Sequence, residues 1–187
     1  MYTKGNTTIF SIDMNNGFAK AGTLYSERIQ ALIEPTVEFF KSAKDKGIKI
    51  IGITDTHLLD ALEFSTYPPH CVLGTDECEI VDELKIYMDE IISKNSTNAF
   101  FSVPNNYEAN HNYIITGCCT DICIYQYATT LLAYLNENGI DSNVIVIKPL
   151  VDTFNMEGHD GDTFNSLFIS SLVSSGVQVA AEAPLLI

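Results

Sequence analysis

The chain has 187 residues, of which 46% are hydrophobic and 18% are charged, so it is long enough for one domain with a sizeable apolar core. Its formal net charge of −14 repels phosphate backbones and excludes nucleic acid as an expected partner, and we interpret the acidity as a source of solubility. No apolar run reaches the roughly 18 residues that a membrane-spanning helix needs, so no membrane partner is expected.

Five cysteines are present, and three of them lie within six residues, at Cys118, Cys119 and Cys123. An odd number with such close spacing argues against a disulfide framework. The start of the chain also lacks the apolar segment that is typical of a secretory signal. We therefore expect a reducing compartment and a cytoplasmic location.

Apolar, β-branched runs alternate with helical patterns, which is typical of βαβ units around a parallel sheet. The predicted strands cover residues 7–13, 49–54, 90–93, 112–116, 142–147 and 177–179. The predicted helices cover residues 26–46, 121–138 and 162–175, and a glycine follows each of them. We predict one domain over residues 1–187, with a three-layer α/β/α fold and a central, mainly parallel sheet of five to six strands.

Two features interrupt this regular pattern. Pro35 lies inside the first predicted helix, and because proline is tolerated in the first turn of a helix, the main helix is predicted to start close to it. Residues 55–84 form a long connection rich in proline, histidine and acidic residues. Loops of this length in a small domain are usually functional or disordered, and the aromatic and ligand-type side chains here favour a function.

Reactive side chains follow the predicted strands one after another. In an open parallel sheet, ligands bind at the carboxyl ends of the strands. Four predicted strand ends deliver a carboxylate, a ligand pair, an ammonium and a thiol to this edge, at Asp13, Asp55 and His57, Lys94, and Cys123. Each residue alone is weak evidence, but their coincidence at one edge favours a catalytic site.

Cys123 is predicted to be the nucleophile. It lies in the first turn of a predicted helix, where exposed N–H groups and the helix dipole lower the pKa of a thiol, and a nearby lysine would add to this. The alternative is a buried cysteine on an apolar helix face, which is the commoner case for a lone cysteine. The other strand ends favour the nucleophile.

Asp13 and Lys94 are predicted to assist this nucleophile. Asp13 would take the thiol proton and later give a proton to the departing amine, and its alternative is a turn-capping aspartate. Lys94 would hold Asp13 and the thiolate in an ion-paired cluster, and its alternative is a solvated lysine at the sheet edge.

The loop after the second strand carries a candidate metal site. Side chains alternate along an extended chain, so Asp55 and His57 point to the same side, and Glu63 and His70 follow in the same loop. Two imidazoles and two carboxylates suit Zn²⁺, Fe²⁺ or Mn²⁺, and a mixed set with open positions is typical of a metal that faces substrate. The alternative is a pair of solvent-exposed loop histidines.

Five segments carry recognisable motifs. They read SIDMNNGF at 11–18, TDTH at 54–57, YPPHCVLGT at 67–75, SKNSTNAF at 93–100 and GCCTDICI at 117–124. In this order and spacing, from about residue 7 to residue 148, they resemble the isochorismatase-like cysteine hydrolases and, within them, the nicotinamidases. The resemblance implies the isochorismatase-like hydrolase fold.

The resemblance also implies a mechanism. Cys123, rather than Cys118 or Cys119, would attack a carboxamide carbon to give a tetrahedral intermediate and then a thioester. The backbone N–H groups of Cys119 and Cys123 would form the oxyanion hole. A cis peptide bond is expected between Cys118 and Cys119.

The same resemblance assigns the ligands. It implies that Asp55, His57, Glu63 and His70 bind a divalent metal, usually zinc, which holds the pyridine nitrogen directly or through water. It places Phe18, Tyr67 and Phe100 against the substrate. The chain departs from the family pattern at four positions: Asn15 replaces a glutamine, Gly17 an aspartate, Tyr67 a frequent tryptophan and Cys119 an alanine.

Three hypotheses follow. The first is a nicotinamidase that releases nicotinate and ammonia, and the metal loop favours it because a metal offers a contact for a ring nitrogen. The second is a metal-independent relative that acts on another small amide, ureide or vinyl ether. The third is a non-catalytic binding module of the same fold. A small-molecule amide is the expected partner, and a homo-oligomer is the expected assembly.

Overall fold

Six parallel strands form one sheet in the computed structural model, which describes residues 2–183. The strands are β1 (Thr7–Ile12), β2 (Lys49–Asp55), β3 (Glu90–Lys94), β4 (Asn112–Cys118), β5 (Asn143–Asp152) and β6 (Gln178–Ala180). Their order is β3-β2-β1-β4-β5-β6, and each neighbouring pair is parallel. The chain therefore builds outward in one direction from β1 and in the other from β4, which makes the β1–β4 boundary the topological switch point where open α/β sheets bind ligands.

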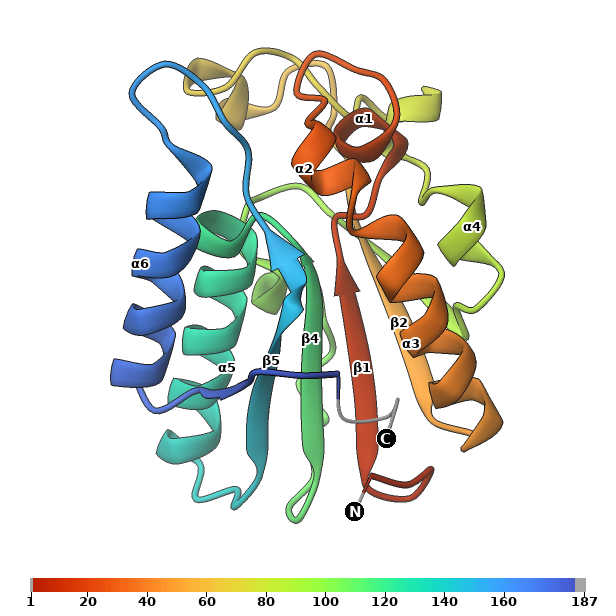
Figure 1. Cartoon of the computed structure of the whole chain (residues 1–187), viewed down its shortest axis with the longest axis vertical. Helices are drawn as coiled ribbons and strands as arrows, with labels where there is room; N and C mark the ends of the chain where they lie inside the picture. Colours follow the sequence, from red (N-terminus) through yellow and green to blue (C-terminus); the bar gives the residue numbers. More distant parts are fainter. Residues whose placement is uncertain (1, 184–187) are drawn as a thin grey trace.

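Helices cover both faces of the sheet (Figure 1). The α-helices are α1 (Asn16–Ala19), α2 (Glu27–Gln30), α3 (Ile33–Asp45), α4 (Asp82–Lys85), α5 (Tyr125–Glu137) and α6 (Gly161–Ser174). Four shorter turns are η1 (Leu62–Ser65), η2 (Asp76–Cys78), η3 (Ala99–Phe101) and η4 (Thr120–Ile124), the last of which is π-helical. Within residues 2–183, no helix is long and apolar enough to cross a membrane. The predicted three-layer α/β/α fold is confirmed.

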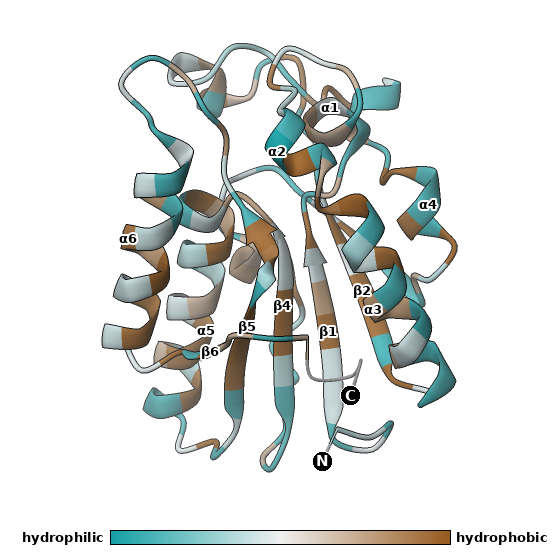
Figure 2. Cartoon of the chain, in the orientation of Figure 1, coloured by the Kyte–Doolittle hydropathy of each residue, from teal (hydrophilic) through white to brown (hydrophobic). Residues whose placement is uncertain are grey.

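The core lies in two layers, one on each side of the sheet. Consecutive residues of β1 point to opposite faces, so Ile9 packs with Phe39 and Phe40 of α3, whereas Phe10 packs with Tyr127 of α5. Hydrophobic residues concentrate along the strands in Figure 2. Because both faces are covered, the strands read as nearly continuous apolar runs rather than as alternating patterns.

The first predicted helix is divided in the structure. The helix α2 ends at Gln30, and α3 begins at Ile33 with Pro35 in its first turn, as the sequence predicted. Proline has no N–H to donate to the carbonyl of Ala31, and its ring clashes with that carbonyl, so a continuous helix cannot pass this point. The break positions α2 beside the carboxyl ends of the strands (Figure 1).

The fifth strand is longer than predicted, because β5 continues to Asp152. The chain bulges beside β4, where the register passes from Ile115 opposite Val146 to Gly117 opposite Val151. Pro149 lies within this bulge, and a proline in an apolar run normally indicates the end of a strand. The bulge accommodates the proline and lets β5 resume pairing at the carboxyl edge of the sheet.

Candidate active site

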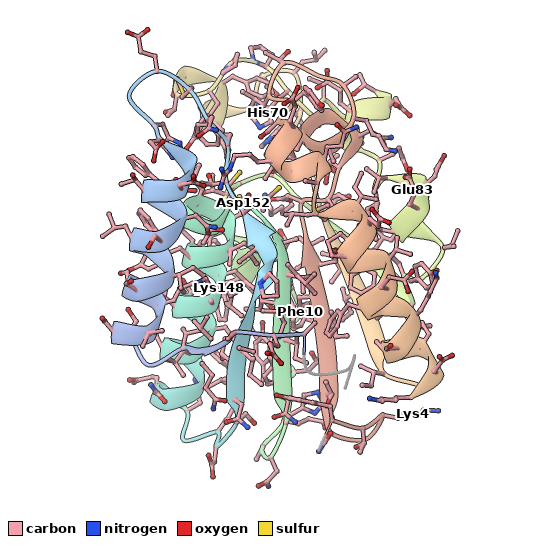
Figure 3. All side chains as sticks on the ribbon, in the orientation of Figure 1. Lys4, Phe10, His70, Glu83, Lys148 and Asp152 are labelled. Carbon is pink, nitrogen blue, oxygen red and sulfur yellow. The ribbon has the colours of Figure 1, made fainter. Side chains whose placement is uncertain are left out.

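The carboxyl ends of the strands form the edge that carries the predicted functional residues. Figure 3 shows His70 above this edge and Asp152 at the end of β5, whereas Phe10 lies lower in the sheet. Asp55 is the last residue of β2 and is paired in register with Lys94, the last residue of β3. Four of the strand ends therefore bring side chains from distant parts of the sequence to one place.

Lys94 is the centre of this cluster. Its side chain is fully buried, and Nζ lies 3.0 Å from Asp13 Oδ2, 2.7 Å from Asp55 Oδ1 and 3.9 Å from Cys123 Sγ. A buried ammonium is stable only when it is paired, and two carboxylates here pair with a single ammonium. The three side chains predicted to be catalytic thus lie together, and Asp55 joins them.

Asp13 is held in an uncommon backbone conformation immediately after β1. Its φ is +54°, a left-handed value that aspartate tolerates better than most residues. Burial raises the pKa of the Asp13 carboxyl to about 6, although the charge of Lys94 opposes the shift. A carboxyl with this pKa can accept a proton at neutral pH and return it, as a general acid/base must.

Cys123 lies in η4 and borders the same cluster. Burial raises the pKa of its thiol well above the usual range, Lys94 lowers it, and the charges of Asp13 and Asp55 raise it further. Burial and the two carboxylates therefore outweigh the lowering of the thiol pKa that was expected from the helix start. The N–H groups of Ile122 and Ile124 donate to the carbonyl of Cys119, so they are engaged within the turn.

The turn between β4 and η4 places Cys119 beside Cys123. The peptide bond between Cys118 and Cys119 is cis, which confirms the expectation. Gly117 has a φ of +112°, and a Cβ atom there would lie 1.9 Å from the carbonyl oxygen of Ile12, so only glycine fits. The Cys118 thiol donates a hydrogen bond to the Asp13 carbonyl at 3.1 Å, which ties this turn to the end of β1.

The four predicted metal ligands lie together. Each of Asp55, His57, Glu63 and His70 offers a ligand atom, and all four atoms lie within 4.8 Å of one another. Nε2 of His57 and Nε2 of His70 lie 2.9 and 3.0 Å from Asp55 Oδ2. Burial and the charge of Asp55 raise the pKa of Glu63.

The outer nitrogens of both histidines are fixed by protein oxygens. Nδ1 of His57 lies 3.0 Å from Asn95 Oδ1, and Nδ1 of His70 lies 2.8 Å from the carbonyl oxygen of Pro68. A carbonyl oxygen only accepts, so each Nδ1 carries the proton in the neutral ring and each Nε2 presents a lone pair to Asp55. Lone pairs facing a carboxylate repel it unless a cation lies between them, so this donor set fits a divalent metal ion.

Two residues that support this group were missed at the level of sequence. Asn95 orients His57, and Asn15 donates hydrogen bonds to the carbonyls of Asp55 and Cys78 at 2.9 and 3.2 Å. Asn15 is fully buried and occupies the motif position at which the family has glutamine. The match of Asn15 to a motif position was the one signal in the sequence for its role. No motif in the sequence distinguishes Asn95.

A cavity of about 510 Å³ joins the two groups. Asp13, Cys119 and Cys123 line it, and so do Glu63 and His70. The rings of Phe18 and Tyr67 also line it, with centroids 5.7 and 6.2 Å from that of His70. Among the residues that the structure describes, no lysine or arginine lines this cavity.

Phe100, which was expected to contact substrate, is not among the residues that line the cavity. Asn98 caps η3 by accepting a hydrogen bond from the Phe100 N–H, and this turn directs the ring into a cluster with Tyr107 and Tyr134 at 6.2 and 5.3 Å. Thr97 lines the cavity instead. Sequence reasoning also missed two walls, which are formed by residues 23–26 with Ile29 and by residues 154–156.

Comparisons with known proteins agree with this fold. A family model described as the isochorismatase domain matches residues 7–168. Nicotinamidase 1 of Arabidopsis thaliana is 26% identical over a match that covers 79% of this chain and 70% of the relative. The N-carbamoylsarcosine amidase of Thermoplasma acidophilum has a TM-score of 0.75 at 18% identity, with 95% of this chain and 96% of that chain covered. A pyrazinamidase of Pyrococcus horikoshii in complex with zinc has a TM-score of 0.72 at 20% identity, with coverage of 94% and 98%.

Proposed function

The chain belongs to the isochorismatase family of hydrolases, and from that premise we propose that it is a cysteine-dependent nicotinamidase, which converts nicotinamide to nicotinate and ammonia. One observation carries the proposal. A buried cluster of Asp13, Lys94 and Cys123 borders the same cavity as the ligand group that contains His57 and His70. The match to a curated nicotinamidase supports it.

The reaction begins from a neutral thiol. As Cys123 Sγ attacks the carboxamide carbon, Asp13 accepts the thiol proton, and the carbonyl electron pair moves to oxygen. The tetrahedral intermediate then collapses, the C–N bond breaks, and Asp13 returns the proton to the nitrogen that leaves as ammonia. Lys94 stabilises both the Asp13 carboxylate and the developing thiolate, since it lies 3.0 and 3.9 Å from them.

Hydrolysis of the thioester uses the same groups. Asp13 accepts a proton from water as the water oxygen attacks the acyl carbon, and the C–S bond then breaks. The proton returns to sulfur, and nicotinate leaves. We assign the backbone N–H groups of Cys119 and Cys123 to the oxyanion in both steps, because Cys119 and Cys123 face the same cavity from one tight turn.

Asp55, His57, Glu63 and His70 are assigned to a divalent metal ion. Zn²⁺ suits this mixed set of nitrogen and oxygen ligands, as do Fe²⁺ and Mn²⁺. A bound ion supplies a Lewis-acid contact for the ring nitrogen of the substrate. Asn95 and the carbonyl of Pro68 hold the two imidazole rings in the orientation that such binding needs.

The charges around the cavity favour a neutral aromatic amide over the carboxylate-bearing substrates of other family members. Asp13 and Glu63 line the cavity, and the described lining residues include no lysine or arginine that would pair with a substrate carboxylate. The buried ammonium of Lys94 already pairs with two carboxylates. Phe18 and Tyr67 both line the cavity close to His70, and such aromatic rings suit a flat ring.

The test is ammonia release from nicotinamide, run beside an N-carbamoyl amino acid, with metal analysis of the same sample. The proposal predicts turnover of nicotinamide that is lost in Cys123→Ala and after strong chelation. Turnover of the N-carbamoyl amino acid alone, unchanged in His70→Ala, would instead indicate a metal-independent relative. No ammonia from either compound, with iodoacetamide labelling Cys123 no faster than the other thiols, would indicate a binding module.

A further inference from the structure

Residues 153–160 connect β5 to α6, and residues 154–156 of this segment form one wall of the cavity. Phe154, Asn155 and Met156 of this segment line the cavity, and Met156 is 63% exposed at its mouth. In Figure 1 the segment rises from the end of β5 above the carboxyl edge of the sheet and then descends to α6. No motif in the sequence pointed to this wall. Its position depends on side chains that lie far away along the chain.

Arg28 of α2 holds the beginning of this wall. Its Nε donates to the carbonyl of Thr153 at 2.9 Å, and its two terminal nitrogens bind Asp152 Oδ1 and Asp162 Oδ1, each at 2.7 Å. A planar guanidinium that binds three acceptors fixes direction as well as distance. Gly161 leaves room for this contact, because a Cβ atom there would lie 2.8 Å from Arg28 Nε.

The helix that carries Arg28 also contributes to the cavity. Ile29 of α2 and the preceding Tyr25 and Ser26 line the same cavity as residues 154–156. Arg28 therefore joins two parts of the cavity lining across more than a hundred residues of sequence. A change in this contact would alter the spacing of the walls.

His159 holds the other end of the segment. Its Nε2 lies 2.7 Å from Asp121 Oδ2, and its Nδ1 lies 3.0 Å from the carbonyl oxygen of Phe154. The imidazole also stacks between Phe154 and Phe164, with ring centroids 4.1 and 3.9 Å away. Asp121 lies in η4, two residues before Cys123, so His159 connects the wall directly to the turn that carries the thiol.

We propose that Arg28 and His159 are positioning residues that hold residues 154–156 as the specificity wall of the cavity, so that aromatic amides are bound in preference to small aliphatic ones. The inference rests on the proposed function for its substrate class. Neither side chain lines the cavity, and both act through Phe154 and its neighbours. Loss of the Arg28 or His159 side chain weakens the binding of an aromatic substrate, whereas Cys123 can still act as the nucleophile.

The first experiment compares Arg28→Met and His159→Phe with the wild type, using kcat and KM for nicotinamide. His159→Phe keeps an aromatic ring between Phe154 and Phe164 but removes both polar contacts. We expect KM to rise about tenfold, which corresponds to about 1.4 kcal/mol of binding free energy, while kcat changes less than about threefold. Arg28→Lys keeps the charge without the planar fork and should restore part of the loss.

The second experiment needs no amidase activity. Cys123 is alkylated with iodoacetamide and with N-benzyl-iodoacetamide, and the modified residue is identified by peptide mass spectrometry. Wild-type protein should react faster with the aromatic reagent, and both variants should lose about tenfold of that advantage, measured as the ratio of the rates with the two reagents. Lys41→Met is the matched control, because its exposed ion pair with Glu38 lies within α3 and away from the cavity.

The outcomes separate the two proposals. An unchanged KM in folded variants, or an equal loss of rate with both alkylating reagents, would overturn the role of the wall. If Arg28→Met fails to fold by circular dichroism, His159→Phe still gives the decisive comparison. If the wild type releases no ammonia from nicotinamide but the variants lose the aromatic preference, the proposed function fails and the wall stands.

Discussion

The ammonium of Lys94 lies 2.7 Å from the carboxylate of Asp55, at the register position where β3 pairs with β2. This contact joins the two parts of the proposed active site, because the second oxygen of Asp55 faces His57 and His70. One carboxylate therefore serves the thiol cluster through Oδ1 and the metal-ligand group through Oδ2. A substitution in the thiol cluster should therefore alter the proposed metal-ligand group, and a substitution in that group should alter the thiol cluster.

Replacing Lys94 should damage both stability and chemistry. Lys94→Met leaves Asp13 and Asp55 buried without their cation, and removing one partner of a buried ion pair costs ~3–5 kcal/mol in the free energy of unfolding. Urea unfolding measures this loss. The exposed pair between Lys85 and Glu79 is the control, and Lys85→Met should change stability by less than about 1 kcal/mol. Equal effects of the two substitutions would contradict a buried, paired Lys94.

The pH dependence of activity should reflect Asp13. Burial raises the pKa of this carboxyl to about 6, and only its ionised form can accept the thiol proton. The value of kcat/KM should therefore be constant above about pH 7 and fall roughly tenfold per pH unit below pH 6. In Lys94→Met the charge that lowers the pKa is lost, so the acid limb should move to higher pH. An acid limb near pH 4 in the wild type would contradict the assignment.

Asn95 should affect metal affinity without touching the metal. Its side-chain oxygen lies 3.0 Å from Nδ1 of His57, and outer contacts of this kind change metal affinity by roughly 10–100-fold when removed. Asn95→Ala should therefore weaken Zn²⁺ binding by that factor in a competition titration with a chelator. Asn106→Ala, at an exposed loop position, is the control. Identical affinities in the two variants would remove Asn95 from the site.

Gly117 should tolerate no side chain. A Cβ atom at this position would lie 1.9 Å from the carbonyl oxygen of Ile12, at a φ of +112°. We expect Gly117→Ala to lower the free energy of unfolding by more than ~4 kcal/mol or to prevent folding. Gly139 also has a positive φ, of +63°, but a Cβ atom there would meet no atom within 4 Å. Gly139→Ala should therefore lower the free energy of unfolding by only about 1 kcal/mol. Similar costs for both would show that the approach of β4 to β1 is not tight.

The sequence was informative where function depends on residues at the ends of strands. Asp13, Lys94 and Cys123 each follow an apolar run, and parallel pairing carries such positions to one edge whatever the length of the connections between them. The proposed metal ligands were recognisable as candidates because three of them lie within short motifs of one loop. These features are local, so a single sequence reveals them.

Features that depend on packing were not predictable in this way. The pKa of Cys123 is set by burial among residues from three strands, which outweighs the helix start that the sequence suggested. The ring of Phe100 lies away from the cavity because Asn98 caps η3, although residues 93–100 match the family motif. The contacts of Arg28 and His159 join positions far apart in the chain, and no spacing rule connects them.

The most direct measurement of the proposed chemistry is the identity of the covalent intermediate. The protein is mixed with nicotinamide, quenched in acid within the first turnover, and digested for peptide mass spectrometry. A nicotinoyl group on the sulfur of Cys123, absent in Asp13→Asn, is the predicted result. Turnover of nicotinamide without any acyl group on Cys123, or with the group on Cys119, would contradict a nucleophilic role for this thiol.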